Sequence, residues 1–337
     1  MAEKTVIVIG AGLAGLSAGC YARMNGFGSK IFEHHSAPGG VATCWKRKDF
    51  FIDGGIHFLM GYKPGGSIYG LYQELGALSG IRIIEMSGYG GYFDEVQGLT
   101  IMVTKDLDCL GDDLKSLFPQ DVGIIEDLIS GSKKMAGGQL GIIEDGCESF
   151  VRAIERRYKE LKGDLQYNAR VVEILVGTQA ADTLIVRIFN YAPRFAPPGK
   201  TVSQASFETD WDYWNDLSKD RAAYEAMKQR VASEILDRLS RYYPGIKDQI
   251  EMTDVATPYT TWRYTLNHRG APEGFQPTPQ TIMAAVPRTL PGLGNFYMAG
   301  QWVMPGGGVP PCLFSGRHAI QLICHQEKQR FVTSSGK

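Results

Sequence analysis

The feature that most constrains the fold lies near the N-terminus, where a short β-branched run leads into closely spaced glycines. Residues 5–9 (TVIVI) are predicted to form a strand buried on both faces of a parallel sheet. Glycines follow at positions 10, 12 and 15, and residues 16–24 can continue as a helix. A second strand is predicted over residues 29–33 (SKIFE), and it ends in a carboxylate 21 residues after Gly12. This order predicts a βαβ nucleotide-binding unit.

Each part of this unit has a chemical reason. Gly10 permits the tight turn, Gly12 lets the backbone approach a diphosphate, and Gly15 lets the helix pack against the strand. Unpaired N–H groups at the helix start bind the diphosphate, and the Glu33 carboxylate accepts hydrogen bonds from ribose hydroxyls. A glycine-rich turn alone is common, but the complete order favours a dinucleotide site over a purely structural turn. The residues predicted to contact the dinucleotide here are Gly10, Gly12, Leu13, Ala14, Gly15 and Glu33.

The composition excludes several other classes of protein. The 337 residues include 41 glycines, whereas an average content of about 7% would give roughly 24. The 35 basic and 36 acidic side chains leave a net charge of −1, which provides no general attraction to nucleic acid. Residues 5–22 carry no charge, but their regularly spaced glycines suit neither a signal peptide nor a membrane span. We therefore expect a globular cytoplasmic protein that binds no nucleic acid.

The cysteines are spread along the chain without a CxxC pair or a histidine-rich cluster. This spacing argues against a zinc site or a disulfide framework, and it predicts reduced, mostly buried thiols. No metal is therefore expected. The six cysteines are Cys20, Cys44, Cys109, Cys147, Cys312 and Cys324.

Three further segments indicate which dinucleotide is bound. They are residues 37–40 (APGG), 51–57 (FIDGGIH) and 295–308 (NFYMAGQWVMPGGG). In these motifs, and over residues 210–279, the chain resembles the FAD-dependent oxidoreductases of the phytoene desaturase, carotenoid isomerase and retinol saturase type, within the flavin amine oxidase superfamily. The resemblance implies FAD as the cofactor. It also implies an α/β fold, in which a Rossmann-like FAD-binding domain of parallel sheet and helices is interleaved with an α+β substrate domain.

The resemblance further implies how the chain is divided. Members of the family are longer, and the resemblance jumps near residues 136–140 and 176–181. Either the substrate cap is reduced in this protein or segments are absent from the chain. We expect the FAD-binding domain over residues 1–75, 140–182 and 288–330, the substrate or cap domain over 76–139 and 183–287, and a tail over 331–337.

The C-terminal motif also favours a flavin on physical grounds. Residues 296–299 are predicted as a strand that ends at Gly300. A loop follows over 306–308, and then a helix over 310–324 with prolines in its first turn. The N-terminus of such a helix would stabilise negative charge on the reduced flavin ring. Gln301 departs from the acidic residue that is common at this position in the superfamily.

The family also implies a contact between the backbone of Val171 and the adenosine end of FAD, with core packing of this valine as the alternative. Together with the two glycines that follow Glu33 and the C-terminal loop, Val171 completes the predicted FAD contacts. These further contacts are Gly39, Gly40, Val171, Gly300, Gln301, Gly307, Gly308 and Val309.

The middle of the chain contains further predicted elements. An amphipathic helix is expected over residues 148–161, and strands over 165–176 and 184–188. A long helix over 219–243 carries one apolar stripe that we expect to pack in the core. The stripe consists of Tyr224, Met227, Val231, Ile235, Leu239 and Tyr242.

Catalytic side chains are harder to predict, because hydride transfer by a flavin needs the protein mainly to bind the cofactor, hold the substrate and exclude water. His57, in the DGGIH segment, is a candidate to face the flavin, with a packing role as the alternative. Arg263 is a weaker candidate to line the substrate side. Trp302 is a candidate wall over the ring, and Cys312 is expected to pack as a buried thiol.

We expect an enzyme that transfers a hydride between flavin N5 and a C–C or C=C bond of an apolar substrate, isoprenoid or carotenoid-like. A flavin amine oxidase is one alternative, although no aromatic cage or lysine near N5 is identified. A non-catalytic isoprenoid-binding protein on the same fold, like the GDP-dissociation inhibitors, is the other. Peripheral contact with a membrane would suit a lipid substrate. The sequence does not indicate an oligomeric state.

Overall fold

The protein is described here by a computed structural model, which covers most of the chain. Val171, the predicted strand beyond residue 168 and Gly306 lie outside the described residues. Within the described part, no helix is both long and apolar enough to cross a membrane. The described residues are 4–65, 67–86, 88–94, 99–136, 141–168, 185–190, 192, 194–275, 278, 281, 286–304 and 307–333.

The N-terminal nucleotide-binding unit forms as its pattern predicts. Strands β1 (Thr5–Ile9), β2 (Gly28–Phe32) and β9 (Asp164–Gln166) build a parallel sheet in the order β1-β2-β9. Helix α1 (Leu13–Met24) connects β1 to β2, so the three elements form a βαβ unit. The Rossmann-like part of the predicted α/β fold is therefore confirmed.

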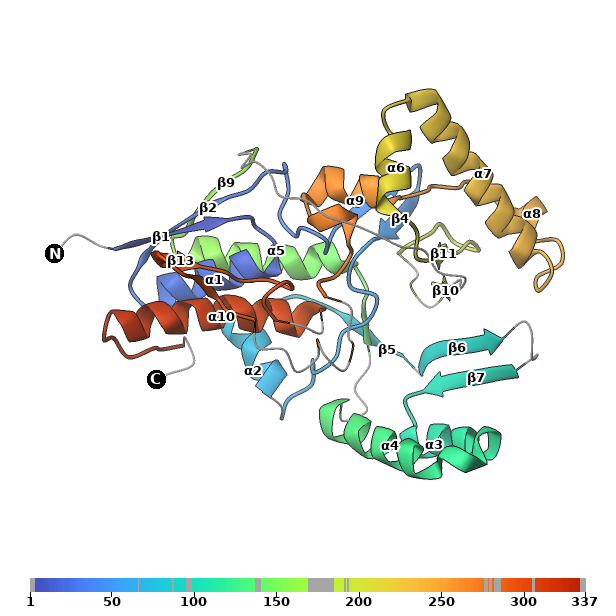
Figure 1. Cartoon of the computed structure of the whole chain (residues 1–337), viewed down its shortest axis with the longest axis horizontal. Coiled ribbons are helices and arrows are strands. Elements are labelled where there is room, and N and C mark those ends of the chain that lie inside the picture. Colours follow the sequence, from blue (N-terminus) through green and yellow to red (C-terminus); the bar gives the residue numbers. More distant parts are fainter. Residues whose placement is uncertain are drawn as a thin grey trace.

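Two further helices complete this half of the molecule. Helices α5 (Cys147–Glu160) and α10 (Val309–Gln326) pack with α1 and β2 around the main hydrophobic core (Figure 1). The Tyr158 hydroxyl donates a hydrogen bond to the Ser29 hydroxyl at 2.9 Å and so ties α5 to β2. A Cβ atom at Gly19 would lie 2.7 Å from the Tyr158 ring. Glycine at this position therefore lets α1 and α5 approach closely.

Strand β1 is only half covered, so the prediction that both of its faces are buried is wrong. Val6 and Val8 pack against the main core. Ile7 and Ile9, which point to the opposite face, are 56% and 64% exposed. Successive side chains of a strand alternate between the two faces of the sheet, and among the described residues the helices cover only one of them.

The other strands pair two by two in antiparallel sheets beside this unit. Strand β10 agrees with the strand predicted over residues 184–188. The pairs are β3 (Cys44–Arg47) with β4 (Phe50–Asp53), β5 (Ile83–Glu85) with β8 (Gly141–Ile143), β6 (Gly88–Asp94) with β7 (Leu99–Thr104), β10 (Ile185–Ile188) with β11 (Ser203–Ser206), and β12 (Thr289–Leu290) with β13 (Leu293–Tyr297).

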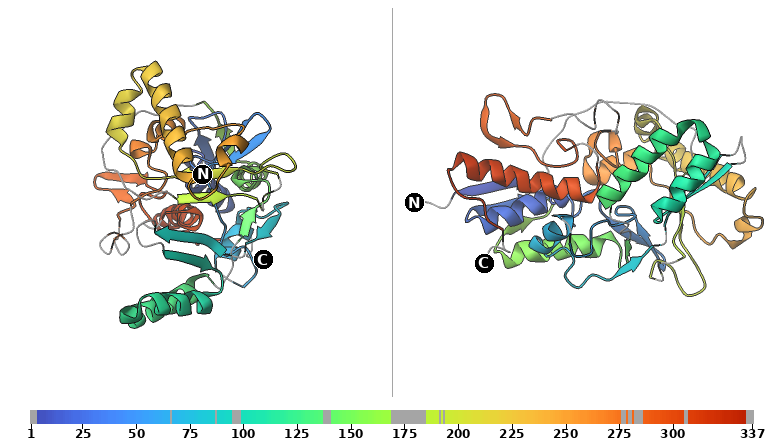
Figure 2. Two further views of the ribbon diagram at one scale, coloured as in Figure 1. Left: turned by 90° about the vertical axis from the view of Figure 1, so that its right-hand side faces the viewer. Right: turned by 90° about the horizontal axis from the view of Figure 1, so that it is seen from below.

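The remaining helices lie mostly away from the parallel sheet (Figure 1, Figure 2). Helices α3 and α4 pack with β7 around a small core of their own, which is formed by Leu110, Ile125 and Ile129. The bounds of the remaining helices are α2 (Ser67–Glu74), α3 (Leu107–Leu117), α4 (Val122–Ala136), α6 (Trp211–Leu217), α7 (Arg221–Leu239), α8 (Ile246–Gln249) and α9 (Pro258–Thr265), with single 3-10 turns at Pro119–Asp121 and His268–Gly270.

Helix α7 confirms the long helix, but not the burial of its whole apolar stripe. Tyr224 is buried, and its hydroxyl lies 2.7 Å from the Thr257 hydroxyl. Tyr242 lies beyond the end of the helix and is 42% exposed. The other four residues of the stripe are half-buried, and its best-covered residue, Tyr224, lies near the N-terminus of α7, where α6 and α9 meet this helix (Figure 1). The domain boundaries expected from the sequence stay a prediction.

Candidate dinucleotide site

Helices α1 and α10 lie side by side and run in the same direction (Figure 1, Figure 2). Near their N-termini, the Ser17 hydroxyl donates to the Leu313 carbonyl at 2.7 Å. At the other end, the Asn25 side chain donates to the Val332 carbonyl at 2.9 Å, just past the end of α10. Both N-termini therefore lie at the end of the sheet where β1 and β2 finish, which is where α/β folds bind nucleotides.

The two helices touch through a glycine. A Cβ atom at Gly316 of α10 would lie 2.3 Å from the Ala14 carbonyl oxygen of α1. Real side chains do not tolerate such a distance to backbone, so only glycine permits this crossing. Gly316 lies seven residues after Val309, the first residue of α10. At 1.5 Å per residue, the N-terminus of α10 therefore extends about 10 Å beyond the crossing.

The first glycine turn has the geometry that a bound diphosphate needs. Gly10 has a φ of +94°, which favours glycine, and its N–H donates to the Phe32 carbonyl at 2.8 Å. A Cβ atom at Gly15 would lie 1.9 Å from the Gly10 carbonyl oxygen, so the helix packs tightly on the turn. A Cβ atom at Gly12 would meet only the Gly39 carbonyl oxygen, at 3.9 Å. The space in front of Gly12 is therefore open toward the start of α1.

A second glycine turn forms the wall of this space. The Gly39 N–H donates to the Ala11 carbonyl at 2.9 Å, which places residues 39 and 40 beside the first turn. Both glycines have positive φ, +121° for Gly39 and +62° for Gly40. The sequence thus identified two turns that the fold brings together from either side of β2.

The Glu33 carboxylate is buried beside the first turn. One of its oxygens accepts a hydrogen bond from the Ala11 N–H at 2.5 Å, and the other accepts from the His35 N–H at 2.7 Å. Each carboxylate oxygen can accept a second hydrogen bond, so both can still receive a ribose hydroxyl. Glu33 thus also holds the turn in place, a role that sequence reasoning missed.

The C-terminal loop is anchored on α10 by a serine. The Gly300 N–H donates to the Ser315 hydroxyl at 2.7 Å, and this hydroxyl donates to the Cys312 carbonyl at 2.6 Å. Ser315 is fully buried. Sequence reasoning did not single out Ser315, and its only signal is a small polar residue on the apolar face of a helix. Gly308, with a φ of +81°, precedes Val309, the first residue of α10.

Residues 267–275 pack over this loop. A Cβ atom at Gly274 would lie 2.1 Å from the Gln301 carbonyl oxygen, and one at Gly307 would lie 2.6 Å from a Glu273 carboxylate oxygen. The Trp302 indole N–H donates to the Asn267 side-chain oxygen at 2.7 Å. Trp302 is thus fixed between the loop and its cover.

The two candidate catalytic residues lie at different places. His57 is half-buried, and burial together with the charge of Arg187 lowers its pKa to about 4. The imidazole is therefore neutral near pH 7, and its buried Nδ1 has no hydrogen-bond partner among the described residues. Arg263 is exposed and lies over the Tyr264 ring, which itself packs against His35. Arg263 is thus connected to Glu33 indirectly, through Tyr264 and His35.

Cys312 lies in the first turn of α10. Burial, followed by the charge of Glu273, raises its pKa to about 11. The side chain is therefore a neutral thiol near pH 7, as expected of a packing cysteine.

Taken together, these residues fit a dinucleotide that carries a second ring system. The open face of Gly12 and the first N–H groups of α1, from Leu13 and Ala14, would hold the diphosphate. The Glu33 carboxylate would hold the ribose, and the N-terminus of α10 would face the other end of the same molecule.

Comparison with known protein families agrees with this geometry. Residues 8–75 match the NAD(P)-binding Rossmann-like domain, and residues 176–324 match the flavin containing amine oxidoreductase family. A crystal structure of an oxidoreductase from Methanosarcina mazei superimposes with a TM-score of 0.57 at 15% identity, over 95% of this chain and 100% of that one. At this identity the match establishes the fold alone.

Two curated relatives are similar over part of the chain. Prolycopene isomerase 2 (chloroplastic) of an Oncidium hybrid cultivar is 30% identical over 128 residues, which are 37% of this chain and 21% of the relative. All-trans-retinol 13,14-reductase of Danio rerio is 31% identical over 136 residues, 38% of this chain and 21% of the relative. The matched part of the chain thus spans about a fifth of the length of these relatives.

The two family models cover the segments that contain both glycine turns and the C-terminal loop, and the resemblance predicted from the motifs is confirmed. The two matched segments are thus similar to FAD-dependent oxidoreductases of the flavin amine oxidase superfamily, including carotenoid-type proteins, and these matches support FAD as the cofactor.

Proposed function

We propose that this protein is an FAD-dependent oxidoreductase that transfers a hydride between flavin N5 and a C–C or C=C bond of an apolar, isoprenoid or carotenoid-like substrate. The observation that carries the proposal is the pair of parallel helices, α1 and α10, whose N-termini both lie where β1 and β2 end. The two curated relatives, named for prolycopene and for all-trans-retinol, support an apolar polyene as the substrate class.

Bound FAD supplies the two-electron chemistry, and the side chains of this protein bind it and shape the site. The positive N-terminal end of α10 favours negative charge near Gly308. His57 is neutral near pH 7, so its Nδ1 atom can form a hydrogen bond with a ligand without placing a charge in an apolar site. Trp302, Phe275 and His268 form an aromatic cluster beside the C-terminal loop, with ring centroids 5.3 and 5.7 Å from Trp302. Such a cluster helps to exclude water.

We also propose which residues contact FAD. Those not yet discussed for this role are Gly39 and Gly40, at the diphosphate, and Val171, at the adenosine end. The C-terminal contacts are Gly300, Gln301, Gly307, Gly308 and Val309. A cytoplasmic location, with peripheral membrane contact when the substrate is a lipid, completes the proposal.

The absorbance spectrum of the purified protein tests the cofactor. We expect the visible bands of a flavin, released from the protein on denaturation. A colourless protein that takes up no added FAD would overturn the proposal.

Replacing Gly12 tests where FAD is bound. An added Cβ atom at this position would lie no closer than 3.9 Å to its nearest neighbour among the described residues, the Gly39 carbonyl oxygen, so we expect Gly12→Val to fold. The valine side chain would fill the space in front of the start of α1, and we expect FAD uptake to fall at least 100-fold. Gly123→Val is the matched control, because a Cβ atom there meets nothing within 4 Å and lies on α4. Full FAD content in Gly12→Val would exclude this position of the diphosphate.

The substrate class is tested by anaerobic mixing of the flavoprotein with candidate substrates while flavin absorbance is followed. We expect a polyene such as prolycopene or all-trans-retinol to change the oxidation state of the flavin, in the direction set by whether the flavin starts oxidised or reduced. Reduction by primary amines alone would identify an amine oxidase. Binding of isoprenoids without any change in the flavin would identify a non-catalytic carrier.

A further inference from the structure

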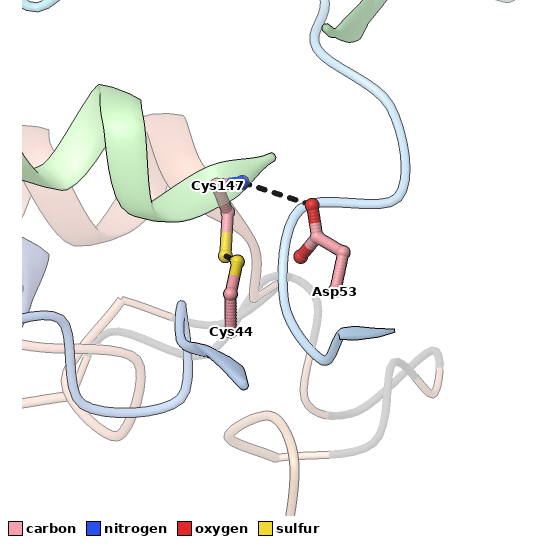
Figure 3. A group of neighbouring side chains, drawn as sticks. All are labelled: Cys44, Asp53 and Cys147. Carbon is pink, nitrogen blue, oxygen red and sulfur yellow. Dashed lines mark hydrogen bonds between the residues drawn. The ribbon is translucent and has the colours of Figure 1, made fainter. Parts of the chain in front are cut away.

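We propose that Cys44 and Cys147 are a redox-active pair that forms a reversible disulfide between β3 and α5. Their sulfur atoms lie 3.3 Å apart and face each other, although the residues are 103 positions apart in the chain (Figure 3). A disulfide bond is about 2.05 Å long, so the sulfurs need to approach by only a little more than 1 Å. The inference is independent of the proposed reaction.

The backbone around the two sulfurs is shaped to fit them. A Cβ atom at Gly55 would lie 3.0 Å from the Cys147 sulfur, and one at Gly146 would lie 3.2 Å from the Cys44 sulfur. Larger residues at these two positions would push against the sulfurs. The nearest atoms to these added Cβ atoms would be the Ala42 Cα, at 2.6 Å for Gly55, and a Phe51 ring carbon, at 2.5 Å for Gly146. The two glycines therefore lie in a tightly packed site that includes both sulfurs.

Asp53 fixes the position of Cys147. One carboxylate oxygen accepts a hydrogen bond from the Cys147 N–H at 2.8 Å, and the other accepts from the Gly55 N–H at 3.1 Å (Figure 3). Cys147 is the first residue of α5, so the carboxylate also caps the start of this helix. Cys44 lies across from it at the start of β3.

These three side chains also lie close enough together to suggest a metal site, with their ligand atoms within 4.8 Å of one another. Two thiolates on one tetrahedral zinc ion, each at about 2.3 Å, would be about 3.8 Å apart. The observed distance of 3.3 Å between the two sulfurs is shorter than this. Burial also raises the pKa of Cys147, which favours the thiol over the metal-binding thiolate. The geometry therefore favours a bond between the sulfurs.

A hydroperoxide is the class of oxidant that we name for this step. Cys147 is buried and Cys44 is only partly covered, so the peroxide meets Cys44 first. The Cys44 sulfur attacks the O–O bond, becomes a sulfenic acid and releases water when the peroxide is H2O2. The Cys147 sulfur then displaces the hydroxyl group from Cys44, with its own proton leaving in a second water. Two electrons pass from the two sulfurs to the peroxide, and a dithiol reductant restores both thiols.

The bond would join two parts of the nucleotide site. Cys44 follows the turn at Gly39 and Gly40, and Gly39 is hydrogen-bonded to Ala11 of the first turn. A cross-link to α5 closes a loop of about 100 residues, and restricting the unfolded chain in this way stabilises the folded one. We therefore expect the oxidised protein to unfold at a temperature several degrees higher than the reduced protein.

Peptide mapping of the full-length protein tests the proposal. The reduced protein is treated with H2O2, denatured in an alkylating agent and digested without a reductant. We expect a peptide that joins Cys44 to Cys147, and a fall from six free thiols to four if no other thiol reacts. Dithiothreitol should restore six. Cys44→Ser and Cys147→Ser should each lose the joined peptide and the rise in unfolding temperature, whereas Cys109→Ser, on exposed α3, should keep both.

Three outcomes would overturn the proposal. In the first, the unsubstituted protein gives no joined peptide. This result does not depend on any variant, so a folding defect cannot cause it. In the second, Cys44 or Cys147 pairs with another cysteine. In the third, zinc added alone binds in a 1:1 ratio, protects both thiols from alkylation and is lost in both serine variants, which would make this a metal site.

Discussion

Two parts of the molecule differ in how they are packed. The nucleotide half contains the parallel sheet with helices α1, α5 and α10, and the outer half contains β6, β7 and the helices away from that sheet. In the nucleotide half, backbone meets backbone, as where Gly15 packs on Gly10 and where Gly316 packs on Ala14. In the outer half, helices α3 and α4 pack around a small core and leave large apolar side chains at the surface, such as Ile124, which is 71% exposed. The nucleotide half therefore has little tolerance for added atoms, while most surface positions of the outer half can change freely.

The largest effect is expected where α10 crosses α1. Gly316→Val places a Cβ atom 2.3 Å from the Ala14 carbonyl oxygen. The helix backbone cannot move far enough to relieve this clash without losing packing, so we expect the free energy of unfolding to fall by at least about 3 kcal/mol. Gly70→Val is the control, because a Cβ atom at Gly70, on α2, meets nothing within 4 Å. Urea denaturation measures both. Equal stability of the two variants would show that the crossing is not tight.

The first glycine turn explains why the βαβ unit was predictable from the sequence, although the crossing of α1 and α10 was not. A glycine turn after a β-branched strand has few alternative structures, so positions 10, 12 and 15 predicted the bounds of β1, α1 and β2 closely. The same pattern could not predict that Ile7 and Ile9 are exposed, because burial depends on what covers the sheet from elsewhere in the chain. Gly316 was missed for a related reason, since its partner Ala14 lies some 300 residues away.

The outer half and the cysteine pair show the limit of local patterns. The spacing of the six cysteines argued against a zinc site or a disulfide framework, and it gave no sign that the fold brings Cys44 and Cys147 into contact. In α7 the apolar stripe was regular along its length, but only Tyr224, near α6 and α9, is buried, whereas Tyr242 is exposed and the residues between them are half-buried. Periodicity predicts which face of a helix is apolar, whereas tertiary contacts determine how much of that face is buried.

A second prediction concerns how stability depends on pH, through the partly buried side chain of His57. Its folded pKa of about 4 is below the value of about 6.5 in an unfolded chain, so the unfolded state binds more protons in this range. The stabilisation is complete above pH 6.5 and is lost as the pH falls toward 4, by roughly 1–3 kcal/mol. His57→Gln should flatten this part of the profile when urea denaturation is repeated between pH 7 and 4. An unchanged slope would place the titration on other groups.

Removal of the Ser315 hydroxyl should have a slightly smaller effect. In Ser315→Ala, the partly buried N–H of Gly300 loses its acceptor, the buried Ser315 hydroxyl, and we expect a loss of about 1–2 kcal/mol in stability. Because Gly300 begins the loop before α10, the variant should also bind FAD more weakly than the unsubstituted protein. Ser240→Ala is the control, since that hydroxyl bonds only a carbonyl at the exposed end of α7. If both variants are equally stable, Ser315 does not anchor the loop.

The smallest effect is expected at Ile124 on α4, which can be compared with Ile129 of the same helix. Ile129 packs against Leu110 and is 9% exposed, so Ile129→Ala should cost about 2–4 kcal/mol of local stability. Ile124 lies on the exposed face, and Ile124→Ala should change stability by less than about 0.5 kcal/mol. Hydrogen exchange of the α3 and α4 amides measures both. A large loss in Ile124→Ala would mean that this face is covered in solution, and the contrast between the two halves would then hold only for the chain taken alone.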